Sequence, residues 1–155
     1  MEKQFVFNYQ EFESVTDMPS SDRDLVSQAI AATSLSYAPY STFNVGAAVR
    51  LDDGRVFTAA NQENAAFPSG LCAERTAMFY AHAHRGKAHL ESVAIAACNG
   101  GEQTAEPVSP CAACRQVMLE FEDSEHPMSV IMVGRDRILK FSSVHDLVPF
   151  SFDSF

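Results

Sequence analysis

Cys72-Ala73-Glu74 and Pro110-Cys111-Ala112-Ala113-Cys114 are the two stretches that decide the fold of this chain. Their three cysteines supply three soft ligands for a metal such as zinc, one short of a closed tetrahedral site. The fourth position is then open to water, as in a catalytic zinc site and unlike a structural one. The glutamate follows the first cysteine closely enough to reach that water without being a ligand. The two stretches therefore predict a metal site with an acid or base beside its open position.

Both stretches stand at the start of a predicted helix, one from Leu71 to about His84 and one from Pro110 to about Glu122. A helix N-terminus carries unsatisfied N–H groups and a partial positive charge, which favours the thiolate that binds metal. The i, i+3 spacing of the second stretch puts both of its sulfurs on one helix face. Arg75 is placed to donate hydrogen bonds to the sulfurs and to tune the metal, with an ordinary solvated arginine as the alternative.

The remaining segments alternate between helices and strands. A helix is expected to begin at a capping Ser20 or Ser21 and to end before Tyr37. Strands are expected at residues 43–51, 55–60, 92–98, 129–133 and 138–141, and a short last helix at 144–149. An Asp-Gly turn joins the first two strands as a hairpin. The turn between the last two is too short for a crossover helix, so they should be antiparallel. This order predicts an α/β fold, a three-layer α/β/α sandwich around a mixed five-stranded sheet.

Length and composition fit one compact domain, because the chain has 155 residues of which 46% are apolar. Residues 20–155 are interpreted as a single catalytic domain. Residues 1–19 are interpreted as an N-terminal extension, either an added edge strand or an ordered arm. Their function does not follow from the sequence.

The charge balance restricts the class of partner. A formal net charge of −9 argues against nucleic acid, because such binding relies on basic residues that neutralise phosphates. A small neutral ligand is more compatible. No apolar run approaches the length of about 20 residues that spans a bilayer, so no membrane partner is expected. The absence of a secretory signal, together with four cysteines, favours thiols and a cytoplasmic location.

Further motifs surround the two cysteine stretches. They are Tyr37-Ala-Pro-Tyr-Ser-Thr-Phe-Asn-Val-Gly-Ala-Ala48, Asn61-Gln-Glu-Asn64, Cys72-Ala-Glu-Arg-Thr-Ala77, Ser109-Pro-Cys-Ala-Ala-Cys-Arg-Gln116 and Asp146-Leu-Val-Pro149. With them the chain resembles the small homotetrameric, zinc-dependent cytidine deaminases over roughly residues 20–152. The cysteine and glutamate pattern is also that of the zinc nucleobase deaminases in general. The combination is far more specific than a single C-x-x-C pair.

The resemblance implies a reaction and a cofactor. Cytidine and 2′-deoxycytidine would be hydrolysed to uridine and 2′-deoxyuridine with release of ammonia. One Zn²⁺ per subunit would be held by Cys72, Cys111 and Cys114, and Glu74 would be the proton shuttle. The sequence does not decide between ribose and deoxyribose.

The resemblance also implies contacts to the nucleoside. Asn61 and Glu63 would hydrogen-bond the ribose 3′-hydroxyl. Phe43 would pack against the pyrimidine, which the backbone of Ala73 would also contact. Neighbouring subunits of a homotetramer complete the active site in this family, and Phe152 matches the C-terminal phenylalanine that contributes to it. Phe150 and Phe155 compete for that assignment.

Two positions depart from the family pattern, and three other functions stay open. Phe67 stands where relatives often carry tyrosine, and Ala112 replaces a usual glycine. One alternative is a related deaminase acting on a blasticidin-type nucleoside antibiotic. A nucleic-acid editor is disfavoured by the short turn before Ile138 and by the acidic charge. A non-catalytic, zinc-stabilised binding protein is disfavoured by the intact Cys72-x-Glu74 pattern.

Overall fold

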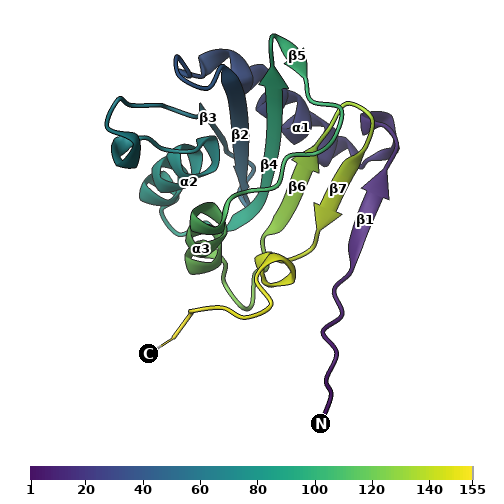
Figure 1. Cartoon of the computed structure of the whole chain (residues 1–155). Coiled ribbons are helices and arrows are strands. Elements are labelled where there is room, and N and C mark those ends of the chain that lie inside the picture. The colour runs from purple at the N-terminus through teal and green to yellow at the C-terminus, as the bar shows by residue number, and fades with distance from the viewer. Residues whose placement is uncertain (155) are drawn as a thin grey trace.

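The computed structural model describes residues 1–154 (Figure 1). Its main elements, in chain order, are β1 (Tyr9–Phe12), α1 (Ser20–Ala32), β2 (Phe43–Leu51), β3 (Val56–Ala60), α2 (Ala73–His84), β4 (Leu90–Asn99), β5 (Glu102–Gln103), α3 (Ala112–Phe121), β6 (Ser129–Val133) and β7 (Ile138–Phe141). Short 3-10 turns occupy Val15–Asp17, Thr33–Leu35, Phe67–Ser69 and Val144–Leu147. The last of these is the expected short last helix, which is of the 3-10 type and ends at Leu147 instead of residue 149.

The strands form one mixed sheet in the order β1-β7-β6-β4-β2-β3, with β5 paired to β4. Among the pairs of named strands in the described residues, only β4–β6 is parallel, and β6–β7 is antiparallel as expected. The expectation of five strands is wrong, because the sheet has seven. The two additional strands are short, polar pieces that carry no apolar run of their own. They form because the backbones of neighbouring strands hydrogen-bond to them. β1 lies at the sheet edge beside β7, with Tyr9 opposite Phe141.

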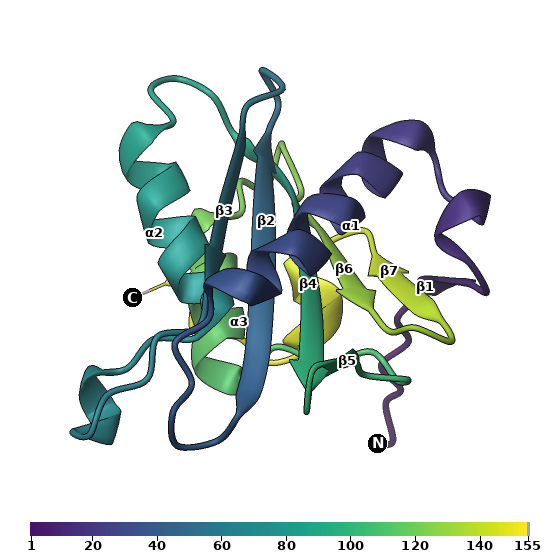
Figure 2. The same cartoon turned by 90° about the horizontal axis from the view of Figure 1, so that it is seen from above.

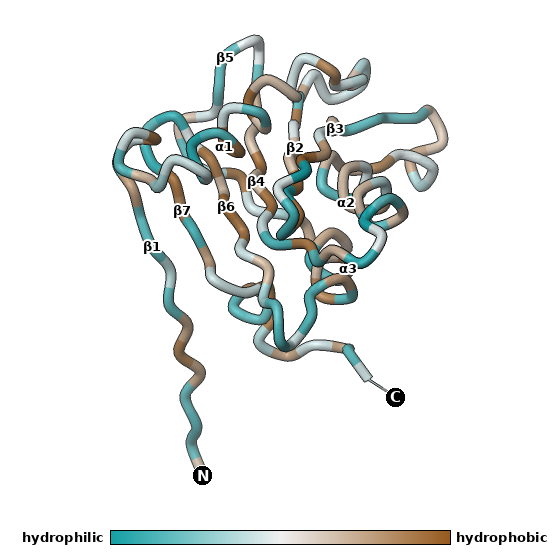
Figure 3. Tube along the Cα trace, turned by 180° about the vertical axis from the view of Figure 1, so that it is seen from behind, coloured by the Kyte–Doolittle hydropathy of each residue, from teal (hydrophilic) through white to brown (hydrophobic). Residues whose placement is uncertain are grey.

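The sheet is covered on both faces, so the expected three-layer arrangement is found (Figure 2). Alternate side chains of a strand point to opposite faces. Val93 and Ile95 accordingly pack in the cluster that contains α2 and α3. Ala94 and Ala96 pack in the cluster that contains α1. Apolar residues are concentrated on the central strands β4 and β6 (Figure 3), which are buried on both sides.

The helix ends differ in detail from the expectation. The expected serine cap of α1 is wrong: Pro19 precedes the helix, and its carbonyl accepts hydrogen bonds from the N–H groups of Asp22 and Arg23. Gly86 lies two residues after His84, the last residue of α2, and its φ of 64° suits glycine just beyond a helix end. The second cysteine helix begins at Ala112, later than the expected Pro110.

Arg115 fixes the start of α3 against the C-terminal segment. Its Nε donates to the carbonyl of Pro110 at 2.9 Å, and its Nη1 donates to the carbonyl of Leu147 at 2.9 Å. Its Nη2 donates to Oγ of Ser109 at 2.6 Å. The loop before the helix therefore enters with a defined direction. Within residues 1–154, no helix has both the length and the apolar character needed to cross a membrane.

Candidate active site

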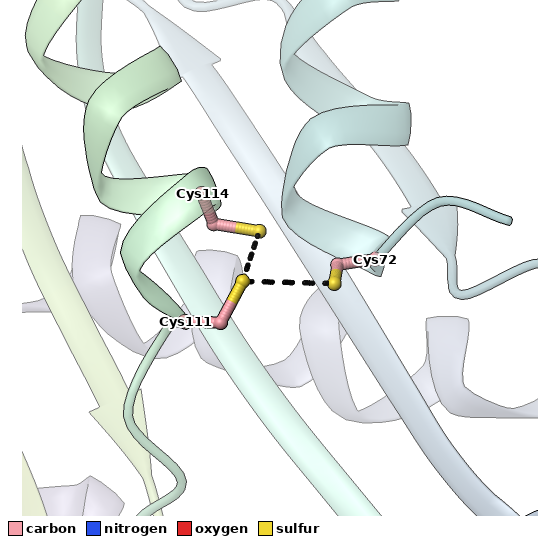
Figure 4. A group of neighbouring side chains, drawn as sticks. All are labelled: Cys72, Cys111 and Cys114. Atoms are coloured by element: carbon pink, nitrogen blue, oxygen red, sulfur yellow. Dashed lines mark hydrogen bonds between the residues drawn. The ribbon is translucent and has the colours of Figure 1, made fainter. Parts of the chain in front are cut away.

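The three predicted cysteine ligands meet between the first turns of α2 and α3 (Figure 4). Cys72 is the residue immediately before α2, Cys111 the residue immediately before α3, and Cys114 lies in the first turn of α3. The two helices pack on the same face of the sheet, so their N-terminal ends face one another across the cluster. All three sulfurs lie within 4.8 Å of one another.

The distances between the sulfurs fit a zinc ion. Sγ of Cys111 lies 3.9 Å from Sγ of Cys72 and 3.5 Å from Sγ of Cys114. Tetrahedral coordination with Zn–S bonds of about 2.3 Å separates neighbouring sulfurs by about 3.8 Å. The donor set is three thiols, which are soft ligands that suit zinc. Three protein ligands also leave a tetrahedral site open at one position.

Arg75 sets the electrostatics of this cluster together with the cysteines themselves. Its Nη2 donates to Sγ of Cys72 at 3.8 Å. Hydrogen bonds from Cys114 and Arg75 lower the pKa of Cys72 to about 5 against the opposing effect of burial. The pKa of Cys114 is raised, because its proton is held in the hydrogen bond to Cys72 and because it is buried. Nε of Arg75 is buried and has no hydrogen-bond partner among residues 1–154.

Glu74 is a buried acidic side chain close to the cysteine cluster. It lies in the first turn of α2 and is only 5% exposed. Burial raises its pKa, and the negative charge of Cys72 acts in the same direction. Hydrogen bonds with its own backbone and with Cys114 act in the opposite direction. A buried carboxyl with a raised pKa can both hold and release a proton, as a general acid and base must.

A cavity of about 540 Å³ adjoins the cysteine cluster. It meets the cluster at Cys72 and Arg75. Its other lining residues come from the two loops that flank β2 and β3, and are Tyr40, Ser41, Asn61, Gln62, Glu63, Asn64, Phe67, Gly70 and Leu71. Its volume falls within the range of small-molecule sites, roughly 300–1,000 Å³.

The two predicted sugar-binding residues both line this cavity, and both are held rigidly. Oδ1 of Asn61 accepts from Ser36 Oγ at 2.6 Å and from the Val45 N–H at 2.8 Å. Its Nδ2 donates to the carbonyl of Phe43 at 2.9 Å. Glu63 accepts hydrogen bonds from the segment just before β2, and these lower the pKa of its carboxyl group. The two side chains are therefore ordered before any ligand arrives.

Of the other predicted contact residues, one lines the cavity and three do not. Phe43 begins β2 and is half-buried, and Ala73 is buried at the start of α2, but neither is among the residues that line the cavity. Phe67 lines the cavity and is 73% exposed. Its ring and that of Tyr40 form a T-shaped pair with 5.7 Å between the ring centroids. Phe152 is 69% exposed outside the cavity lining, and its carbonyl accepts from Gln116 Nε2 at 2.9 Å.

Phe150, the first competitor of Phe152, is 93% exposed, and Phe155 lies outside the described residues. Sequence reasoning assigned no role to Tyr40, Ser41 or Asn64, although all three line the cavity. All three lie within the motifs at residues 37–48 and 61–64. Those motifs identify the segments near the site, but they do not show which side chains line the cavity.

Comparison with known proteins agrees with this geometry. Residues 19–130 match the family described as the cytidine and deoxycytidylate deaminase zinc-binding region. The cytidine deaminase of Sporosarcina psychrophila is 37% identical over 128 residues, which cover 83% of this chain and 88% of that protein. The cytidine deaminase of Halalkalibacterium halodurans is 46% identical over 96 residues, 62% of this chain and 68% of that one.

Solved structures show the same likeness. A crystal structure of cytidine deaminase from Burkholderia pseudomallei superposes with a TM-score of 0.71 at 37% identity, covering 87% of this chain and 100% of that one. That of Mycobacterium tuberculosis gives 0.66 at 34% identity, covering 84% and 96%. The fold and the cysteine cluster define a zinc-dependent deaminase of the α/β type. The chain belongs to the cytidine and deoxycytidylate deaminase family.

Proposed function

We propose that this protein hydrolyses cytidine and 2′-deoxycytidine to uridine and 2′-deoxyuridine, with release of ammonia. The observation that carries the proposal is the meeting of three sulfurs and a buried Glu74 beside a cavity of about 540 Å³. Its lining suits a nucleoside, since Asn61 and Glu63 present an amide and a carboxylate to it. The named relatives support the same reaction.

Cys72, Cys111 and Cys114 would hold one Zn²⁺ per subunit. When bound, the metal supplies an activated water as nucleophile. Glu74 takes the proton of that nucleophile on its carboxylate. It delivers this proton to the ring nitrogen N3, then takes the second proton from the new hydroxyl on C4 and passes it to the amino group. A C4–O bond forms, the C4–N bond breaks, and the amino group leaves as ammonia.

The remaining predicted residues would bind and orient the nucleoside. Asn61 and Glu63 would hold the 3′-hydroxyl, Phe43 would pack against the pyrimidine, and the backbone of Ala73 would contact the same ring. Arg75 would stabilise the thiolates through its contact with Cys72. Phe67 lacks the hydroxyl of the tyrosine common in relatives, so it offers the ligand an aromatic face alone.

A direct assay tests this function. Purified, zinc-loaded protein is mixed with cytidine, and the loss of absorbance at the cytosine band is followed, with deoxycytidine and blasticidin in parallel. Glu74→Gln should keep its zinc and lose turnover by roughly a hundredfold or more, since general acid–base catalysis contributes 10²–10⁴-fold. Glu120→Gln, an exposed glutamate on α3, is the matched control and should stay active. Failure of the zinc-loaded wild type to turn over cytidine and deoxycytidine would refute the proposal, and turnover of blasticidin alone would favour the antibiotic deaminase instead.

The same proposal includes a homotetramer with shared active sites, in the cytoplasm. It is supported by the exposed aromatic side chains of Phe67 and Phe152, which suit burial against neighbouring copies. The four cysteines are free thiols, which suits a reducing compartment.

Sedimentation of the purified protein tests the tetramer, and cell fractionation tests the location. Residues 20–155 would act as the single catalytic domain, with residues 1–19 as an extension.

A further inference from the structure

Ser41 lies where the cavity wall turns into β2, and it contacts two of the predicted substrate-binding residues. Its Oγ donates to Oε1 of Glu63 and accepts from the backbone N–H of Phe43 at 3.1 Å. Its own backbone N–H donates to Oε2 of Glu63 at 3.2 Å. One serine thus joins the carboxylate to the start of the strand that carries the phenylalanine. Ser41 itself lines the cavity.

The hydrogen bonds of Glu63 leave its carboxylate a single site for a ligand. A carboxylate has about four lone-pair positions. Oε2 accepts from the N–H groups of Tyr40 and Ser41, at 2.8 and 3.2 Å, and is therefore filled. Oε1 accepts from the Ser41 hydroxyl, so one position on Oε1 stays open to the cavity ligand. Without that hydroxyl, Oε1 would have two open positions and no fixed direction.

The hydrogen bonds of Asn61 leave its amide group a single donor for a ligand. Its amide oxygen has two lone pairs, and its nitrogen two hydrogens. Ser36 and Val45 fill the oxygen, and Phe43 takes one hydrogen. One N–H donor is left on Asn61 and one acceptor on Glu63, and both side chains line the same cavity. One donor plus one acceptor is the complement of a single hydroxyl group, which both donates and accepts.

We propose that Ser41 is a positioning residue for sugar recognition: its hydroxyl directs the open acceptor of Glu63 so that the pair with Asn61 reads one hydroxyl of the nucleoside. The inference rests on the proposed function. Ser41 need not contact the ligand, because it acts through Glu63.

The backbone next to Ser41 supports a fixed orientation. Thr42 has a φ of 56°, in the left-handed region, which is uncommon for a β-branched residue. Its N–H donates to the carbonyl of Ala38 at 3.0 Å, and its hydroxyl donates to the carbonyl of Ser41 at 2.6 Å. Strained backbone of this kind persists where surrounding contacts hold it. The loop therefore presents Ser41 to Glu63 in one defined conformation.

The test compares binding of uridine with binding of 3′-deoxyuridine, by calorimetry on the zinc-loaded protein. In Ser41→Ala the Kd for uridine should rise about tenfold, since hydrogen bonds to charged groups are the stronger kind. The Kd for 3′-deoxyuridine should change less than about twofold, because the group that Glu63 reads is missing. Ser41→Thr keeps the hydroxyl, so its Kd for uridine should stay close to that of the wild type. Ser34→Ala is the control, since Ser34 is exposed and its hydroxyl donates to the Ala31 carbonyl, away from Glu63.

Turnover gives an independent readout. Ser41→Ala should raise KM for cytidine and leave kcat within about threefold, because the contact is remote from the reacting carbon. Equal weakening of both nucleosides, or a fall in kcat alone, would assign Ser41 to loop folding and overturn the proposal. If Ser41→Ala fails to fold, Ser41→Cys replaces it, since a thiol is only a weak donor. A wild type that neither binds uridine nor deaminates cytidine instead overturns the proposed function, and this inference with it.

Discussion

Gly46 of β2 lies directly against the backbone of α1 at Ala29, with no room for a side chain between them. A Cβ at position 46 would stand 2.6 Å from the backbone nitrogen of Thr33, and closer still to the carbonyl oxygen of Ala29. Real Cβ atoms essentially never approach another atom within 3.0 Å. Because the opposing atoms are backbone, they cannot rotate away. This contact sets the spacing between α1 and the sheet, and with it the position of the loop that follows α1 toward the site.

Gly46→Ala should therefore be strongly destabilising. We expect the free energy of unfolding to fall by about 3 kcal/mol, because the overpacked helix must shift as a unit. Urea denaturation of the purified protein measures it. Gly100→Ala is the control: that position has open space but a φ of 61°, so it should lose only about 1 kcal/mol. Equal losses at the two positions would contradict the packing argument.

Thr42 offers the opposite outcome, a stabilising substitution. Thr42→Asn should raise the free energy of unfolding by about 0.5–1 kcal/mol, because asparagine tolerates the left-handed region better than a β-branched residue. Thermal unfolding followed by circular dichroism measures the shift. Thr58→Asn, at an exposed position of β3, should instead be neutral or slightly destabilising. A lower stability of Thr42→Asn would show that the threonine hydroxyl outweighs the strain.

Asp22 ties the start of α1 to both halves of the sheet. Its buried carboxylate lies 3.2 Å from Nη2 of Arg50 on β2 and 2.5 Å from Nζ of Lys140 on β7. Asp22→Ala should cost about 2–3 kcal/mol of unfolding free energy, less than a fully buried pair because both cations keep some contact with water. Asp53→Ala removes the exposed partner of Arg55 and should leave the urea midpoint almost unchanged. A similar small effect for both variants would contradict the role of burial.

Arg75 should act on metal affinity. Arg75→Gln removes the cation beside Cys72, and we expect zinc affinity to fall about tenfold, a typical effect of outer-shell substitutions. Competition with a chromophoric chelator measures the affinity. Arg135→Gln, whose side chain pairs with the adjacent Asp136 on the surface, should bind zinc as the wild type does. Chelator-stripped wild type should lose turnover and regain it when Zn²⁺ is returned.

In the N-terminal extension, strand β1 should contribute to stability and residues 1–6 should not. Deleting residues 1–6 should leave the unfolding midpoint unchanged, because all six are exposed. Deleting residues 1–19 should lower it, because β1 and the buried Met18 are lost and the edge of β7 is uncovered. Thermal unfolding of the two truncated proteins distinguishes the segments. An unchanged midpoint in the longer deletion would show that β1 is dispensable.

Most of the fold could be predicted from local patterns. The strands at Phe43–Leu51, Ser129–Val133 and Ile138–Phe141 have the expected bounds, because each is an apolar run ended by turn residues. The edge strand β1 was one of two alternatives for residues 1–19, and the structure has it beside β7. The short strand β5 could not be predicted, because its stability comes from the neighbouring ladder and not from its own side chains. The cap of α1 was missed for a related reason. Ser20 and Ser21 have capping chemistry, but the carbonyl of Pro19 already accepts the first hydrogen bonds.

The sequence by itself determined the chemistry of the site: three thiols and a carboxylate at helix starts, since ligand type and spacing are local properties of the chain. The tertiary structure decided what those groups face. Only packing brings Cys72 to within 3.9 Å of Cys111, and only burial raises the pKa of Glu74. The link from Ser41 to Glu63 also depends on two distant segments meeting at the cavity wall. Long-range contacts of this kind are set by how helices and strands pack, and no short stretch of sequence encodes them.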